Sequence, residues 1–405
     1  MRRIAWVLLL IFAFAIPWEY SLELGEPLGN IARVVGLLLL LVAIPAVFQA
    51  GRLRTPGTML WLVLALYLWF CCTCFWTIEP LATLTKLRGY FQEMMIVWLV
   101  WEFAESADDL RALMRAYIAG SWVLAALTLA NYVSTDAMTN QQVRFVATGQ
   151  DPNDVARFLN LAFPLAALLV NSEQKWPWRL LAAGYFPLGL VAVLLTASRG
   201  GFLEVMVALA GSGILLGYGH PKRVWAGALA LPPLAALIWW IVPRGSLERL
   251  ATINEQLQGG GLNLRWNIWT AGWHAFVKAP LFGTGAGSFV SAAGLSPIDT
   301  AHNAALSIAV GGGLVALFLA VAIVAVVVWS LIQTKGPLRW ALALTLVIWG
   351  ITSMVATVEE NRTSWLLLAM ITLAGRLAAE EPERLEECFP AVVSRRELLA
   401  ASEPM

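Results

Sequence analysis

The sequence is poor in charged residues. Asp, Glu, Lys and Arg together supply 13% of its 405 residues, against roughly 25% in soluble domains. Hydrophobic residues supply 59%, and the mean hydropathy is +0.72. The net charge is +1 and there is no basic arm or domain, so we expect no nucleic-acid partner. This composition excludes an ordinary soluble fold of this length.

Residues that bind metals or form disulfides are also scarce. There are only 4 cysteines and 3 histidines, and three of the cysteines fall in one apolar segment, so no disulfide framework is implied. The sequence has no His-Glu-x-x-His, no Walker motif and no Asp-x-Asp pair in an outer loop. We therefore expect no metal and no cofactor. Chemistry on a phosphorylated substrate would then rely on arginine, whose planar guanidinium binds phosphate oxygens in pairs and stays charged.

Long apolar segments are what the chain does have. About twelve of them approach the length needed to cross roughly 30 Å of hydrocarbon as a helix. The 20 tryptophans fit many lipid–water boundaries. We therefore predict an all-α, polytopic membrane protein with about twelve transmembrane helices. The segments are 4–18, 31–50, 58–76, 87–103, 113–133, 155–170, 180–198, 200–218, 224–242, 304–332, 340–356 and 363–377.

The distribution of Lys and Arg between alternate loops predicts the orientation. Short cytoplasmic loops carry an excess of these residues, whereas the first outer loop, residues 19–26, has none. Both termini are therefore expected in the cytoplasm. The predicted domains are a transmembrane domain (1–377) with a main outer loop (244–303), and a cytoplasmic tail (378–405). The basic residues of the cytoplasmic set are Arg2, Arg3, Arg52, Arg54, Arg111, Lys175, Arg179, Lys222, Arg223, Lys335, Arg339, Arg376, Arg384, Arg395 and Arg396.

A second set of basic residues lies at or beyond the outer boundary. Positive charge on the translocated side opposes the insertion bias, so an anionic ligand at the outer surface is the simplest reason for it. Arg88, about one turn into its predicted span, is a candidate; the alternative is a side chain that snorkels to the interface. The outer set is Arg33, Lys86, Arg88, Arg144, Arg157, Arg199, Arg244, Arg249, Arg265 and Arg362.

The stretch 263–278 in the long outer loop predicts an amphipathic helix that lies against membrane lipids. Its polar face holds Asn267 and His274, and Trp269 and Phe276 lie opposite. Arg265 falls within the apolar arc, where a charge must find a partner or a polar pocket. The alternative is that Arg265 snorkels to lipid phosphate.

Arg199 sits where one span ends and the next begins, in Thr196-Ala-Ser-Arg-Gly-Gly201. The two glycines permit a tight reversal and a close approach to the backbone. Glu204, about one turn further in, is an intramembrane carboxylate and a candidate ion-pair partner. Arg199 is therefore either a ligand-binding residue or half of a structural Arg–Glu pair.

His302 precedes a long span and is our candidate general base. A helix N-terminus disfavours the imidazolium, and a neutral imidazole can accept a proton. Asp299 or Thr300 is expected to cap this helix; the alternative role for His302 is a cap or a hydrogen bond. If His302 is not the base, Asp299 and Glu360 are the next candidates.

A glycine-rich segment, 281–288, precedes His302. No βαβ unit surrounds it, so it does not indicate a nucleotide site. We expect it to form a flexible turn.

Five motifs in this order resemble the O-antigen ligase/polymerase superfamily of membrane glycosyltransferases, and hydropathy agrees along nearly the whole chain. Length and the modest outer loop most resemble the ligases. The sequence departs from the pattern at Val310-Gly-Gly-Gly313, near where many members have a glutamate. The motifs are Asp151-Pro-Asn-Asp154, Ser198-Arg-Gly-Gly201, Arg265-Trp266, Pro280-Leu-Phe-Gly-Thr-Gly-Ala-Gly and His302-Asn303.

The resemblance implies a GT-C-type helical fold and a metal-independent reaction at the periplasmic face of the bacterial inner membrane. The donor would be a glycan on undecaprenyl diphosphate, and the acceptor a sugar hydroxyl of lipid A–core. Arg199 and Arg265 would bind the diphosphate, and His302 would activate the acceptor hydroxyl. We expect a monomer.

Three other functions stay open from the sequence. The nearest is a Wzy-type polymerase, whose acceptor is a second lipid-linked glycan. A protein O-oligosaccharyltransferase would usually carry a larger C-terminal periplasmic region. A transporter would tend to place its charged residues at the membrane midplane on broken helices, whereas the charged residues here are predicted at one face.

Overall fold

The computed structural model describes residues 1–25, 29–135, 144–217, 221–252, 265–297 and 299–390. Within these ranges the chain is helical, and the only β-pairing is an isolated bridge between Glu23 and Asn30. The prediction of an all-α membrane protein is confirmed. All four cysteines are free.

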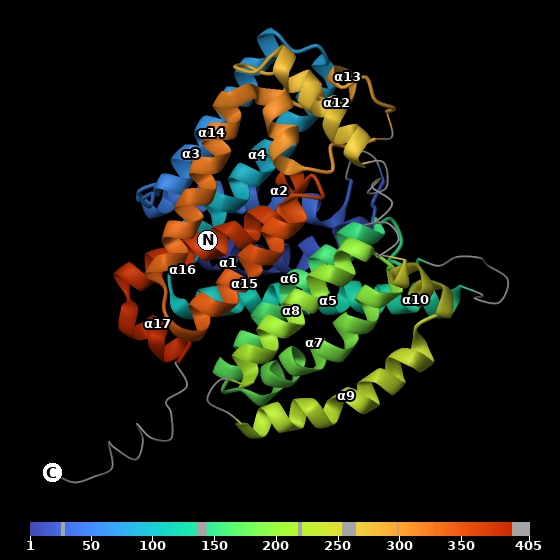
Figure 1. Cartoon of the computed structure of the whole chain (residues 1–405). Coiled ribbons are helices and arrows are strands. Elements are labelled where there is room, and N and C mark those ends of the chain that lie inside the picture. Colours follow the sequence, from blue (N-terminus) through green and yellow to red (C-terminus); the bar gives the residue numbers. More distant parts are fainter. Residues whose placement is uncertain (26–28, 136–143, 218–220, 253–264, 298, 391–405) are drawn as a thin grey trace.

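Each predicted apolar segment coincides with a long helix in the described part of the chain (Figure 1). By length and composition, eight helical segments can cross a membrane: α1 with η1, α2, α3 with η2, α5, α6, α7, α8 and α14. That α4, α9, α15 and α16 also cross it stays a prediction. The helices are α1 (Arg2–Ala15), α2 (Ile31–Ala50), α3 (Thr58–Cys72), α4 (Pro80–Phe103), α5 (Ala107–Ser134), α6 (Pro152–Ser172), α7 (Trp176–Leu195), α8 (Arg199–Gly217), α9 (Pro221–Ile241), α14 (Ala304–Gln333), α15 (Gly336–Ser353) and α16 (Arg362–Glu380).

Short helices connect these long ones. They are η1 (Ile16–Ser21), η2 (Thr73–Phe75), α10 (Arg244–Ala251), α12 (Arg265–Lys278), α13 (Phe289–Ala292), η4 (Val358–Glu360) and α17 (Pro382–Cys388).

Helix α6 is the centre of the bundle. It packs against α5, α7, α8 and α15, and 89% of its apolar window is buried. Residues 161–170 are all apolar, so every side of this part of the helix needs apolar surroundings. Asp151 caps it by accepting a hydrogen bond from the Asn153 N–H at 2.8 Å, and Pro152 occupies the first turn, where a missing N–H costs nothing. The start of the most buried helix is thereby fixed at one end of the molecule.

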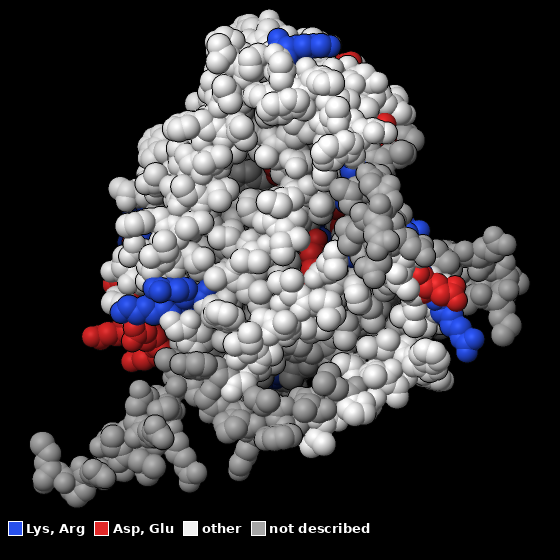
Figure 2. Space-filling model, in the orientation of Figure 1, with Lys and Arg blue, Asp and Glu red and all other residues white. Residues whose placement is uncertain are grey.

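The loops predicted to be cytoplasmic meet at one end of the bundle. Arg2 pairs with Glu102 at 2.8 Å, and Arg384 pairs with Asp108 at 2.9 Å. Figure 1 shows α17 at this end and α10 at the opposite one, as the alternation of loops requires. Between the ends, the face shown in Figure 2 is largely uncharged, with charged side chains at its edges and in a central hollow.

The glycine-rich segment 281–288 is not the flexible turn that we expected. Gly285 N donates to the Gly311 carbonyl at 2.9 Å, and Leu314 N donates to the Pro280 carbonyl at 2.8 Å. The segment thus fills a break in α14 at Gly313, where φ is +68°. The break requires glycine because an added Cβ at Gly313 would lie 2.2 Å from the Leu281 oxygen. This docking explains the glycine at 313; an added Cβ at Gly312 would instead meet Ala316 and Phe70.

Helix α12 forms as predicted, with the predicted apolar and polar faces, but protein and not lipid covers the apolar face. It buries Ile268, Gly272 and Ala275 against α13 and α14, with Phe289 in the same cluster. Trp266 and Trp273 remain 61% and 56% exposed, beside the exposed His274. The apolar face of α12, which we expected to contact membrane lipids, therefore packs against the rest of the protein. Residues 263 and 264 of the predicted helix lie outside the described residues.

Candidate active site

A cavity of about 430 Å³ brings Arg265 and His302 together. The distant segments that line it converge at the end of the bundle that carries α10 and α12. They are η1, the start of α6, the start of α12, the segment before α14 and the loop between α15 and α16. The lining residues are Tyr20, Asp151, Asn153, Asp154, Arg157, Arg265, Thr300, His302, Val355, Ala356, Thr357, Glu360 and Asn361.

His302 reaches this cavity through an unusual backbone conformation. Its φ is +47°, and only one other described non-glycine residue, Ala197, has a positive φ. Such conformations cost of order 1–3 kcal/mol and cluster at functional sites. The next residue, Asn303, caps α14 by accepting from the Leu306 N–H at 2.8 Å. Asn303, and neither Asp299 nor Thr300, is therefore the cap, which corrects our expectation.

The surroundings of His302 favour its neutral form. Burial lowers the pKa of the imidazole below its usual 6.5, and the Arg265 charge lowers it further, against the opposing effect of Asp151 and Asp299. The ring is thus neutral at physiological pH and able to accept a proton. Burial, the largest cause of this lowered pKa, could not be predicted from the sequence, where we argued from the helix N-terminus alone.

Arg265 is held in the cavity by the burial of α12. It lies on the same side of the helix as Ile268 and Gly272, both of which are buried. Its guanidinium makes no hydrogen bond or ion pair with any described residue, and Asp151 is the opposite charge that acts on it. A half-buried guanidinium with this little compensation is suited to an anionic ligand.

Arg199 lies next to the cavity and not in its lining. Ser198, beside it, donates from Oγ to Asn153 Oδ1 at 2.8 Å, which ties the start of α8 to the cavity wall. Arg199 Nε donates to the Arg249 carbonyl at 3.2 Å, and Arg144 Nη2 donates to Asn153 Oδ1 at 3.1 Å. We call Arg144, Arg199 and Arg249 the rim arginines.

The rim arginines are close enough to affect one another. Burial lowers the pKa of Arg144, and the charges of Arg249 and Arg199 lower it further, while Asp151 opposes them. The ion pair that we considered between Arg199 and Glu204 is not formed. Glu204 is buried and accepts instead from Asn160 Nδ2 at 3.3 Å. A concentration of mutually repelling guanidiniums is stabilised by a bound anion.

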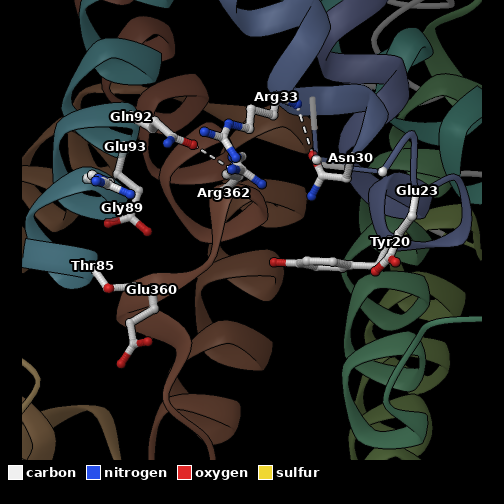
Figure 3. Close-up of a pocket in the computed structure, with 13 residues that line it drawn as sticks. Tyr20, Glu23, Asn30, Arg33, Thr85, Gly89, Gln92, Glu93, Glu360 and Arg362 are labelled. Atoms are coloured by element: carbon white, nitrogen blue, oxygen red, sulfur yellow. Dashed lines mark hydrogen bonds between the residues drawn. The ribbon is translucent and has the colours of Figure 1, made fainter. Parts of the chain in front are cut away.

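Arg88 lines a different cavity, of about 560 Å³. Helix α4 begins at Pro80, earlier than predicted, so Arg88 lies more than two turns into it and is exposed. Arg33 and Arg362 line the same cavity (Figure 3). The structure therefore separates Arg88 from Arg265 and His302. Tyr20 and Glu360 line both cavities and form the boundary between them.

Several lining residues were not among our candidates. Arg157, paired with Asp154 at 2.7 Å, belonged to the outer basic set, which was the signal that could have selected it. The rim arginines Arg144 and Arg249, outside the lining, belonged to the same set. Tyr20 and Asn361 had none, because only tertiary packing brings them to the cavity. Among the described residues, no group of three or more His, Cys, Asp or Glu side chains could hold a metal ion.

Residues 184–321 match the family model described as O-antigen ligase. The chain carries an O-antigen ligase family domain. The family resemblance drawn from the motifs is thereby confirmed. The matched segment contains Arg199, Arg265 and His302 but ends before Glu360. The match implies a glycosyltransferase-like membrane enzyme that acts on lipid-linked glycan and lipid A–core in general. No curated protein matches the chain.

Proposed function

We propose that this protein transfers a glycan from undecaprenyl diphosphate to a sugar hydroxyl of lipid A–core at the periplasmic face of the bacterial inner membrane. One observation carries the proposal. A partly buried histidine with a lowered pKa shares a cavity with Arg265, whose charge no described carboxylate pairs with, beside three further arginines. A base next to an anion-binding site is what transfer from a diphosphate requires.

The residues divide the reaction between them. The acceptor hydroxyl oxygen attacks the anomeric carbon of the donor sugar, and the bond from that carbon to the diphosphate breaks. The hydroxyl proton passes to the free imidazole nitrogen of His302. The diphosphate leaves with the bonding electron pair, and its charge is held by Arg265 and the rim arginines. Arginine takes this role without a metal because it stays charged and binds two oxygens at once.

The proposed orientation places this cavity outside and both termini in the cytoplasm. It can be tested with single cysteines in a cysteine-free background. A cysteine introduced by His274→Cys, on the exposed side of α12, should react with an impermeant maleimide in intact cells. A cysteine introduced by Lys335→Cys, at the opposite end, should react only after lysis. The reverse result would contradict the orientation.

The reaction itself is tested by transfer with purified protein, lipid-linked glycan and lipid A–core, with and without EDTA. We expect glycosylated lipid A–core in both conditions. Elongation of the lipid-linked glycan with no modified core would show a polymerase instead. Activity lost in EDTA and restored by Mg²⁺ or Mn²⁺ would contradict the arginine-only reaction.

Donor binding gives a second readout. Arg265→Ala and Arg199→Ala should weaken binding of the lipid-linked donor by roughly tenfold or more, the usual size of a charge-assisted hydrogen bond. Arg265→Lys should recover little, because an ammonium does not reproduce the bidentate fork. Arg244→Ala is the matched control, since Arg244 is exposed at the same end and lines neither cavity.

A further inference from the structure

The larger cavity, which contains Arg88, has no role in the reaction described so far. Figure 3 shows side chains of α4 facing those of η1 and α2 across it, with Arg33 and Arg362 both among the lining residues. Its 560 Å³ is enough for a sugar or two with their substituents. We refer to it as the second cavity, and to the one with His302 as the catalytic cavity.

The second cavity offers two guanidinium groups without a partner among the described residues to whatever occupies it. Arg33 and Arg88 line it, and neither side chain makes a hydrogen bond or ion pair with a described residue. Arg362 also lines it, paired with Glu19 and held by Gln92. The first two guanidiniums are therefore available to a phosphate or carboxylate, while Arg362 is fixed in the wall.

Hydrogen-bond acceptors line the same cavity. Glu93 is 2% exposed, and its Oε2 has no partner among the described residues. An unsatisfied buried carboxylate oxygen is costly unless a ligand or water donates to it. Glu23 adds a further carboxylate to the lining, and Glu360 lines it as well, paired with Lys86. Carboxylates repel phosphate but accept hydrogen bonds from hydroxyls, so the cavity suits a ligand that carries both anionic groups and hydroxyls.

The second cavity lies directly beside the catalytic cavity, so a molecule bound in it could take part in the reaction. Tyr20 and Glu360 line both cavities, so a molecule in the second cavity lies one side chain away from the catalytic cavity. A saccharide bound there could extend one of its hydroxyls past this boundary toward His302. The donor diphosphate would meanwhile occupy the opposite side, at Arg265 and the rim arginines.

We propose that the second cavity binds the acceptor, and that it recognises a saccharide bearing phosphate or carboxylate groups through Arg33 and Arg88. The assignment rests on the proposed transferase function and adds the chemical class of the acceptor's recognition group. The headgroup of an anionic phospholipid shares the phosphate but offers few hydroxyls to Glu93 and Glu23. The acceptor saccharide satisfies both kinds of lining residue.

The test uses the full-length protein in vesicles of neutral phospholipid, with saturating lipid-linked donor. The acceptor is lipid A–core, either phosphorylated or treated with phosphatase. We compare wild type with a double variant, Arg33→Ala with Arg88→Ala, and with the control Arg244→Ala. The double variant should raise the KM for phosphorylated core roughly tenfold to a hundredfold. Its kcat and donor affinity should be unchanged, and its melting temperature should show that it is folded.

Removal of the phosphates from the acceptor distinguishes specific recognition of phosphate by Arg33 and Arg88 from a general loss of acceptor binding in the double variant. Phosphatase treatment should raise the wild-type KM toward that of the double variant and leave the variant nearly unaffected. Equal sensitivity in both proteins, or a fall in donor affinity in the variant, would overturn the assignment. If wild type and variant differ only after anionic phospholipid is added, the cavity is a lipid headgroup site and the proposal is wrong.

Equilibrium binding of the same two acceptors, without donor, separates this proposal from the proposed function. Wild type that binds phosphorylated core through Arg33 and Arg88 but transfers nothing would contradict the transferase and support the cavity assignment. If the double variant transfers glycan as well as wild type does, the transferase is supported and the cavity assignment is contradicted.

Discussion

The two ends of the helical bundle use arginine differently. At the end predicted to be cytoplasmic, arginines face carboxylates. Arg115 Nη2 lies 2.6 Å from Glu173 Oε1, and Arg2 binds both Glu102 and Glu105 at 2.8 Å. At the other end, Arg265 lines a cavity without an ion pair to any described residue. Some basic residues of the outer end also form ion pairs, as Arg157 does with Asp154. The two ends therefore differ in how many of their arginines are paired with carboxylates, and the difference is one of degree.

This contrast distinguishes arginines that stabilise the fold through ion pairs from arginines that line a cavity and are suited to bind a ligand. A buried ion pair is satisfied within the protein, and loss of one partner leaves the other uncompensated. Charges that converge on a cavity, next to a base whose pKa is lowered, are typical of an active site. We therefore expect substitutions at the paired end to change stability, and those at the cavity end to change activity.

The largest expected effect is at His302. His302→Ala should lower turnover by on the order of 10²–10⁴-fold, the usual contribution of a positioned general base. Donor binding should be retained, because the diphosphate contacts are assigned to arginines. Turnover and donor binding are measured separately in the purified protein.

His274→Ala is the control for that substitution, since His274 is exposed on α12 and outside both cavities. It should leave both quantities unchanged. If His302→Ala keeps more than roughly a tenth of wild-type turnover, the effect is too small for the essential base. Glu360, which lines the same cavity, then becomes the better candidate.

A stability effect is expected where segment 281–288 docks into α14. Gly313→Ala forces a side chain onto a backbone with φ +68° and 2.2 Å from the Leu281 oxygen. It should lower the free energy of unfolding by about 1–3 kcal/mol from backbone strain alone. Gly350→Ala, inside α15 where an added Cβ meets open space, should not lower it and should raise it by up to about 1 kcal/mol. Unfolding midpoints in the same detergent compare them, and equal midpoints would show that the docking is dispensable.

A stability effect of similar size is expected at the paired end. Arg115→Ala leaves the buried Glu173 with Arg111 at 3.9 Å as its remaining partner. The free energy of unfolding should fall by about 1–3 kcal/mol, the cost of a charged hydrogen bond lost from a buried group. Arg384→Ala, at the exposed pair with Asp108, should give no measurable shift.

Transfer by both paired-end variants should match wild type once the amount of folded protein is equal. A clear loss of turnover in folded Arg115→Ala would show that the two ends are not separable in this way.

Hydropathy predicted most of the fold because a membrane restricts the chain to helices, which satisfy their backbone groups internally. The order of helices and the relative side of each loop follow from this restriction. The docking of 281–288 into α14 could not be predicted in the same way. It depends on pairing between backbone segments some 25 residues apart, and the glycines that permit it resemble those of an ordinary turn.

The candidate site was predictable in part. Arg265 was selected because a charged side chain on the apolar face of a helix must reach a partner or a polar pocket. In the structure it lines the cavity that contains His302. Arg88 was selected on its charge and its depth in the predicted span, and neither property can tell one cavity from another. Tyr20 forms the boundary between the two cavities, yet its position depends wholly on how η1 packs against the bundle. The roles of these residues stay predictions.

The pH dependence of turnover tests the central claim, that His302 acts as a base under the charge of Arg265, most directly. Since burial and Arg265 lower the pKa of His302, wild-type turnover should fall only as the pH drops below 6.5. Arg265→Ala removes a cation that disfavours the imidazolium, so its pKa should rise and the fall should begin at a higher pH. Both profiles are measured at saturating donor and acceptor. An acid limb at the same pH in both proteins, or one that persists in His302→Ala, would contradict the account.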